Sequence, residues 1–225
     1  MAPILGPREE PRRAAGPQIA HTPLAGPSRS QAGGGAGAGD EAVSSLGTGT
    51  AASLRIAAQA DDPAFAEEYR RLAGHMPRPV AVLGVNRRGL RHAITVDSFL
   101  DVSYDPPTMA VSVYGGSRMA ESLASVGAFS LSILTAEQKG TAQWLGEPGQ
   151  PLRGPLDTVA TFEAPSGAPV VSDCAAWFDL AIAERFEAAT HDLVIGTVTA
   201  LGPVAAPPRA PLVRWDDGYH SPVRR

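Results

Sequence analysis

Apolar residues beyond residue 60 fall into short runs, many with the two-residue period of β-strands, and turn residues separate these runs. Phe129, Leu131 and Ile133 alternate with serines, as expected for a strand that buries one face. Trp177–Phe186 fits either a helix or a strand, but its apolar residues share one parity, which favours a strand. The segments predicted as strands are Val80–Val85, Arg91–Val96, Thr108–Val113, Phe129–Leu134, Trp177–Phe186, Leu193–Leu201 and Pro211–Trp215. Turn residues at 86–89 join the first two strands into a hairpin.

Three other segments have helical spacing. Asp62 followed by Pro63 is a typical helix start, and Thr135 with Gln138 three residues later has the pattern of a capping box. The first expected helix runs from Asp62 to Gly74 and has Phe65, Tyr69 and Leu72 on one face. The second ends at Gly127 and has Met119, Leu123 and Val126 on one face. The third is Ala136–Leu145, with Trp144 and Leu145 on its buried side.

These elements predict a mainly β fold with some helix (β+α). A parallel sheet needs strands that alternate with long helices, whereas here the turns are short and the helices modest. We therefore expect an antiparallel barrel of six or seven strands with a few peripheral helices. The Pro/Gly-rich stretch 146–168 is expected to be a long loop.

The first sixty residues differ from the rest. Eight of the ten residues from Gln31 to Asp40 are Gly or Ala, and prolines recur before them. Such a segment buries too little apolar surface to offset its ordering entropy, so residues 1–60 are predicted to be a disordered Ala/Gly/Pro-rich leader. The leader has no apolar core of a secretory signal, and early acidic residues argue against an organelle transit peptide. Residues 61–225 are predicted to form one domain.

Composition excludes several functions. The net charge of −4 and the lack of a basic cluster argue against nucleic-acid binding, and no apolar run is long enough to suggest a membrane span. Cys174 is the only cysteine, which rules out an internal disulfide and fits a reducing cytoplasm; we expect it to be a buried, inert thiol. The five histidines are scattered singly, so no metal site is predicted.

Ser117 and Arg118 open the second predicted helix. Unsatisfied amides and the positive end of the helix dipole favour an anion at such a place, and a guanidinium adds charge-assisted hydrogen bonds. This pattern indicates a phosphate site. The structural alternative, in which Ser117 is only an N-cap and Arg118 a surface residue, is favoured if nothing else in the sequence supports a ligand.

The densest group of polar residues is Thr95-x-x-Ser98-Phe99-x-x-Val102-Ser103-x-Asp105-Pro106-Pro107. It resembles the T-x-N/S-S-F-x-S-V-S-x-D-P-P signature of the flavin reductase family with the FMN-binding split barrel. Four further motifs are similar to that family in order and spacing: Pro77-Arg78-Pro79-Val80-Ala81, Ser117-Arg118, Phe129-x-Leu131-x-Ile133-Leu134, and Thr190-His191-x-Leu193-x-Ile195-Gly196-x-Val198. The resemblance runs from about Phe65 to Tyr219.

The resemblance implies a homodimer with a flavin groove at the subunit interface. Residues 95–99 (Thr95, Val96, Asp97, Ser98 and Phe99) would line the isoalloxazine edge, and Ser117 and Arg118 would hold the phosphate. His191 would help to place nicotinamide; that it is simply a partly buried strand-end histidine bonded to the backbone is an equally good interpretation. Trp215 and Tyr219 either cover the groove or anchor the tail.

Several positions depart from the family pattern. Asp97 stands where Asn or Ser is usual, and Asp101, Met119, Ser132 and Thr190 replace Ser, Thr, Asn and Asp. A carboxylate at position 97 would repel a phosphate, so we expect it to face a cation or to accept from the N–H groups of the ring. Because Met119 lacks a hydroxyl, the flavin is expected to be held weakly and to act as a passing substrate.

The sequence therefore predicts a cytoplasmic NAD(P)H-dependent flavin reductase. It would use NADH or NADPH to reduce FMN, or FAD, and supply reduced flavin to a separate monooxygenase component. Two alternatives stay open. One is an oxidoreductase that retains FMN and acts on a specific small molecule; the other is a non-catalytic flavin-binding split barrel, which the substitutions at the positions above would favour.

Overall fold

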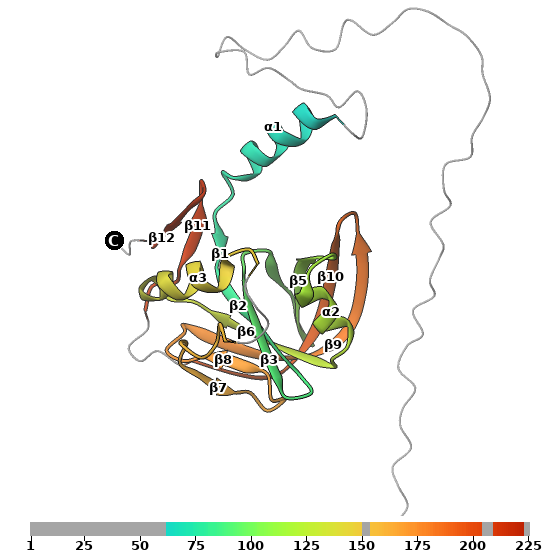
Figure 1. Ribbon diagram of the computed structural model, residues 1–225, viewed down its shortest axis with the longest axis vertical. Coiled ribbons are helices and arrows are strands. Elements are labelled where there is room, and N and C mark those ends of the chain that lie inside the picture. The colour runs from blue at the N-terminus through green and yellow to red at the C-terminus, as the bar shows by residue number, and fades with distance from the viewer. Residues whose placement is uncertain (1–61, 150–153, 204–208, 223–225) are drawn as a thin grey trace, which may run out of the picture. The chain divides into compact units, whose positions relative to one another are not determined.

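A seven-stranded antiparallel sheet dominates the computed structural model, which describes residues 62–149, 154–203 and 209–222 (Figure 1). Its strand order is β3-β2-β6-β9-β10-β5-β4. The two end strands, β3 and β4, do not pair with each other, so the curled sheet is a split barrel rather than a closed one. The predicted fold class is confirmed.

The strands of this sheet are β2 (Ala81–Arg87), β3 (Leu90–Val96), β4 (Phe99–Tyr104), β5 (Pro107–Tyr114), β6 (Ala128–Ile133), β9 (Ala176–Ala188) and β10 (His191–Pro203). Two small sheets accompany it, made by β1 (Arg78–Pro79), β11 (Val213–Trp215) and β12 (Gly218–His220), and by β7 (Thr161–Glu163) and β8 (Pro169–Val171). The helices are α1 (Pro63–Ala73), α2 (Arg118–Ala124), the short 3₁₀ turn η1 (Ala136–Gln138) and α3 (Lys139–Gly146).

The main core fills the interior of the curled sheet and is covered by α2. Phe129, Leu131 and Leu180 are fully buried there, and Met119 and Leu123 of α2 pack against them. At Gly196 of β10 the packing leaves no room for a side chain, because a Cβ atom would lie 2.9 Å from Cβ of Leu180 and 3.0 Å from the Phe129 ring. A second cluster lies on the other face of β2 and β3, beneath α3.

Local sequence signals account for most of these elements. Asp62 caps α1 by accepting hydrogen bonds from Ala64 and Phe65, as its position before Pro63 predicts. The β2–β3 hairpin turns at Arg88 and Gly89, both with positive φ. At the start of η1 the Gln138 side chain accepts from the Thr135 N–H (3.0 Å), so that half of the predicted capping box is present.

Two expectations about the fold are wrong. The stretch 146–168 is not loop throughout, because β7 lies within it and pairs with β8. Trp144 is 40% exposed rather than buried, and its indole N–H donates to the Pro155 carbonyl, 2.8 Å away. The segment Phe99–Tyr104 was missed as a strand.

Cys174 is fully buried in a third, small cluster with Val170 and Ala164. Burial raises the pKa of its thiol to about 11. The thiol is therefore protonated at neutral pH, in agreement with the predicted inert role. The predicted leader lies outside the described residues.

Candidate flavin site

A cleft of about 460 Å³ opens between β3, the start of α2 and the segment that follows α3. We call it the β3–α2 cleft. It is lined by Thr95, Ser117 and Arg118 of the predicted site together with His92, Ala93, Ile94, Tyr114, Met119, Leu145, Gly146, Glu147, Pro148 and Gly149. Residues more than twenty positions apart in sequence thus meet at one cleft.

Thr95 fixes one wall of this cleft. Its hydroxyl donates a hydrogen bond to the Ala142 carbonyl of α3 at 2.8 Å, and Gly146 lies close enough that an added Cβ would be 3.5 Å from Cβ of Thr95. The hydroxyl proton is therefore used within the protein. The oxygen still has acceptor capacity for a ligand N–H.

Ser117 and Arg118 line the cleft from the start of α2. Ser117 is the N-cap of α2, because its hydroxyl accepts from the Ala120 N–H at 3.1 Å. The structural role considered for Ser117 is thus present. Arg118, the first residue of α2, lines the cleft beside it.

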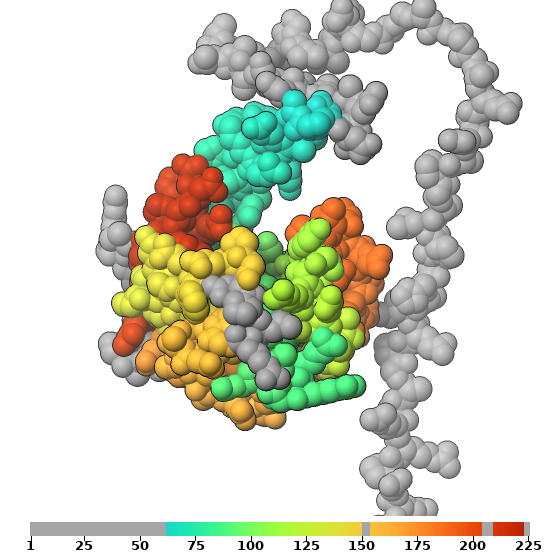
Figure 2. All heavy atoms as spheres, in the orientation of Figure 1, coloured from blue at the N-terminus to red at the C-terminus, as the bar shows by residue number. Residues whose placement is uncertain are grey.

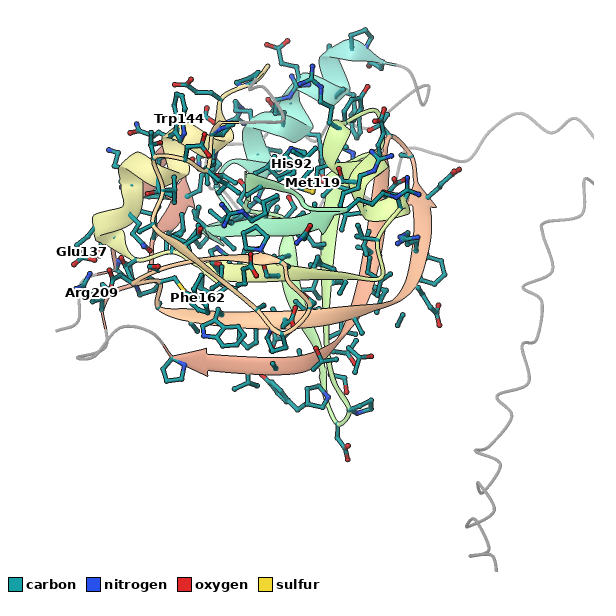
Figure 3. All side chains as sticks on the ribbon, turned by 60° about the horizontal axis from the view of Figure 1, so that its bottom comes forward. His92, Met119, Glu137, Trp144, Phe162 and Arg209 are labelled. Carbon is teal, nitrogen blue, oxygen red and sulfur yellow. The ribbon has the colours of Figure 1, made fainter. Side chains whose placement is uncertain are left out.

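His92 of β3 is a cleft residue that the sequence did not single out. It is 9% exposed, and its Nδ1 lies 3.4 Å from the Ser122 hydroxyl, which in turn donates to the Arg118 carbonyl at 2.9 Å. Burial lowers the pKa of His92, and the charge of Arg118 lowers it further. Figure 3 shows His92 next to Met119, the buried α2 residue that replaces the hydroxyl of the family pattern. This arrangement arises from the packing of α2 on β3, and no local sequence motif predicts it.

The remaining residues of the 95–99 segment face different surroundings. Val96 is buried in the main core and Phe99 packs against it, so both offer a ligand only main-chain groups. The Ser98 hydroxyl donates to Asp97 at 3.3 Å. Asp97 faces cations: its Oδ2 lies 3.7 Å from Nη1 of Arg78 and 3.7 Å from Nε of Arg214.

His191 begins β10 and is exposed, rather than partly buried. Its Nδ1 lies 3.0 Å from the Thr190 hydroxyl, and its ring meets the edge of Tyr114 with the centroids 5.9 Å apart. Tyr114 lines the β3–α2 cleft, while His191 and Asp97 line a second, larger hollow. The structure thus brings Thr95, Ser117 and Arg118 together in the β3–α2 cleft and places Asp97 and His191 in the second hollow.

The two C-terminal aromatic residues have different roles. Tyr219 packs against the second core cluster, which anchors the tail, whereas Trp215 is 46% exposed and lines the second hollow. Within the described ranges, no helix has the length and apolarity needed to cross a membrane.

The split barrel and its cleft belong to a known class of protein. Residues 73–222 match the model of the flavin reductase like domain, so the chain belongs to that family. The family predicted from the five motifs is confirmed.

Two reductases of known name are similar to the chain in sequence. The chain is 32% identical over 154 residues to the NADH-dependent flavin reductase StyB of Pseudomonas fluorescens, which covers 68% of this chain and 87% of StyB. It is 35% identical to a probable flavin reductase of Rhizobium meliloti over 47% of this chain, but spans only 33% of that relative's length.

Solved structures give the same fold. The flavin reductase component BorF of a bacterial two-component tryptophan halogenase superimposes with a TM-score of 0.65 at 28% identity, covering 71% of this chain and 99% of BorF. The NADH:FAD oxidoreductase SgcE6 of Streptomyces globisporus, in complex with NAD and FAD fragments, has a TM-score of 0.65 at 26% identity, covering 71% of this chain and 93% of SgcE6.

Proposed function

We propose that this protein is an NADH-dependent flavin reductase that transfers hydride from nicotinamide to FMN and releases reduced flavin to a separate oxygenase. The observation that carries the proposal is the β3–α2 cleft, which Thr95 and Arg118 of two family motifs both line. The activities for which StyB and SgcE6 are named support it, as does the role of BorF as the reductase component of a halogenase.

The donor set of the cleft suits a flavin phosphate. Arg118 supplies a fixed positive charge, and its planar guanidinium matches phosphate oxygens in a bidentate manner. Main-chain groups of residues 95–99 and the Thr95 oxygen would meet the polar edge of the ring. Met119 provides no hydroxyl and is 1% exposed, which supports weak retention of the flavin and its use as a substrate.

When bound, flavin supplies the hydride acceptor at N5, and the nicotinamide C4 supplies the hydride. This step needs no general acid from the protein. The residues of the chain would bind both rings, orient them for the transfer and exclude water. His191, whose ring touches Tyr114 at the border of the cleft, is proposed to help place nicotinamide.

A homodimer is proposed as the working form. The edge strand β4 exposes Leu100, Val102 and Tyr104, with exposed fractions of 53%, 51% and 85%. Large apolar residues gathered on an unpaired sheet edge are typical of a surface that another chain covers. Measurement of the molar mass in solution tests this point. A cytoplasmic location and a single catalytic domain over residues 61–225 belong to the same proposal.

The decisive experiment is oxidation of NADH and NADPH by the purified protein with FMN, FAD or riboflavin as acceptor. Turnover with added flavin is the expected result, and its absence would overturn the proposal. Yellow colour that survives dialysis, with turnover of a specific small molecule, would favour an FMN-retaining oxidoreductase. Tight FMN binding without any NAD(P)H turnover would favour a non-catalytic flavin-binding protein.

A further inference from the structure

The second hollow lies between α1, β1, the start of β10 and the turn that joins β11 to β12. Its volume is about 650 Å³, within the range of small-molecule sites. In Figure 2 this open space separates α1 and the β11–β12 hairpin from the tip of the β9–β10 hairpin. We call it the arginine hollow because Arg70, Arg78 and Arg214 line it.

Two of these arginines are held in an unusual position. Arg78 of β1 and Arg214 of β11 are direct cross-strand partners in an antiparallel pair. Like charges placed opposite each other destabilise such a pair unless an anion lies between them. Asp97 supplies that anion, with one carboxylate oxygen 3.7 Å from each guanidinium.

The ion pairs with Asp97 leave Arg78 and Arg214 able to bind a further anion. Both distances exceed the 2.7–3.2 Å of a good N–H···O bond, and one carboxylate balances only one of the two positive charges. The Arg78 and Arg214 side chains are 34% and 45% exposed. Arg78 also donates to the Ala73 carbonyl at 3.1 Å, which uses one of its five N–H groups and fixes its place at the end of α1.

Acidic groups also line the hollow, so that three carboxylates accompany its three arginines. Asp216 and Asp217 lie in the β11–β12 turn and line the hollow as well. The Asp217 side chain is 98% exposed and lies 3.7 Å from Nη2 of Arg214, so water and salt screen it. Asp97 is 23% exposed, and it is the acid placed between the two arginines.

Aromatic surfaces complete the hollow. Trp215 and Tyr69 are 46% and 66% exposed, and both line it. Exposed aromatic faces are suited to stacking with a purine. At the other end, His191 leads to Tyr114 and the β3–α2 cleft, so a molecule lying in the hollow can extend toward the proposed flavin.

We propose that the arginine hollow binds the adenosine diphosphate part of the reducing dinucleotide. Arg78 and Arg214 bind the pyrophosphate, Trp215 or Tyr69 stacks with the adenine, and the nicotinamide points toward His191. Asp97 holds the arginines in place in the empty hollow and competes with the pyrophosphate for them. This inference rests on the proposed function, since it assigns the dinucleotide substrate of that reaction to the arginine hollow.

Steady-state kinetics with FMN as acceptor test the assignment, because FMN carries no adenosine diphosphate. Arg214→Gln is expected to raise KM for NADH about tenfold or more, the loss typical of a charge-assisted bond to a phosphate, and to leave KM for FMN unchanged. ADP-ribose is expected to compete with NADH and to bind the variant correspondingly less tightly. Arg71→Gln is the control: this arginine lies on α1 and pairs with Glu68 away from the hollow.

Asp97→Asn is expected to change the affinity for ADP-ribose in the opposite direction. Without the competing carboxylate, ADP-ribose is expected to bind more tightly than to the wild type. Circular dichroism checks that both variants are folded. An unchanged KM for NADH in Arg214→Gln, or an Arg214 effect confined to FAD as acceptor, would overturn the inference.

Failure of the proposed function is distinguishable from failure of this inference. If the wild-type protein oxidises no NADH, the proposed function is wrong, and calorimetric titration with ADP-ribose still tests the hollow. Binding that Arg214→Gln weakens supports the site, and absence of binding to the wild type refutes it.

Discussion

His92 and Ser122 face each other inside the protein, with Nδ1 of the imidazole 3.4 Å from the hydroxyl oxygen. The hydroxyl donates a hydrogen bond to the Arg118 carbonyl at 2.9 Å, which leaves its oxygen to accept and assigns the proton of the imidazole to Nδ1. A buried side chain of β3 thereby supports the first turn of α2, which carries Arg118, the residue proposed to bind the phosphate.

The pH dependence of stability follows from this burial. The pKa of His92 is lowered in the folded state by desolvation and by the nearby Arg118 charge. As pH falls through about 6.5, the unfolded chain takes up a proton that the folded chain refuses, so the free energy of unfolding decreases by at most about 1.4 kcal/mol per pH unit from this group. Urea unfolding at pH 7.5 and 5.5 measures the effect.

The control for this prediction is His92→Gln, which removes the titrating group but keeps an N–H for Ser122. The variant is expected to lose less stability than the wild type on going to pH 5.5. Equal losses in the two proteins would show that His92 does not titrate differently in the folded state.

Arg118→Ala is expected to weaken FMN binding more than riboflavin binding. Only FMN has the phosphate that the guanidinium would bind, and loss of a charge-assisted contact costs about 1.5–3 kcal/mol, or roughly ten- to a hundredfold in Kd. Fluorescence titration with both flavins gives the comparison, and Arg87→Ala, at the exposed end of β2, is the control. Equal weakening for the two flavins would remove Arg118 from the phosphate site.

Local signals explain which elements were predictable. The β2–β3 hairpin follows from an apolar run, turn residues at Arg88 and Gly89 and a second run, all within one short segment. In β4, Leu100, Val102 and Tyr104 alternate with Asp101 and Ser103, but the apolar residues are the exposed ones, and the register with β5 shifts between Asp101 and Ser103. A short edge strand of this kind, with a bulge and exposed apolar residues, lacks the buried apolar face on which the other strand predictions relied.

The site was predictable only where a motif spans it. Thr95 and Arg118 were found through the family resemblance, and they line one cleft. His92 and Arg214 were not, because each depends on contacts between distant segments: α2 packs on β3, and the C-terminal β11 pairs with β1. For Asp97 the expectation left open a cation or the N–H groups of the ring, and the structure places two arginines beside its carboxylate.

Cys174 is expected to resist alkylation in the folded protein. It is fully buried, and the pKa of about 11 leaves almost no thiolate at pH 8. Iodoacetamide labelling followed by mass spectrometry should show slow modification in buffer and complete modification in urea. Rapid labelling of the folded chain would mean that the third cluster opens readily.

Gly196→Ala tests the close packing of the barrel interior. The new methyl group would lie 2.9 Å from Cβ of Leu180 and 3.0 Å from the Phe129 ring, and both are fully buried, so neither has room to move aside. Overpacking of this kind costs about 1–3 kcal/mol of the free energy of unfolding. Chemical denaturation gives the value directly.

Gly140→Ala is the matched control, because it makes the same substitution on α3 where nothing lies within 4 Å of the added Cβ. There the change is expected to be neutral or to stabilise by up to about 1 kcal/mol, since alanine favours helix more than glycine does. A Gly196→Ala protein as stable as the Gly140→Ala protein would contradict the close contact between β10, β9 and β6 on which the barrel core depends.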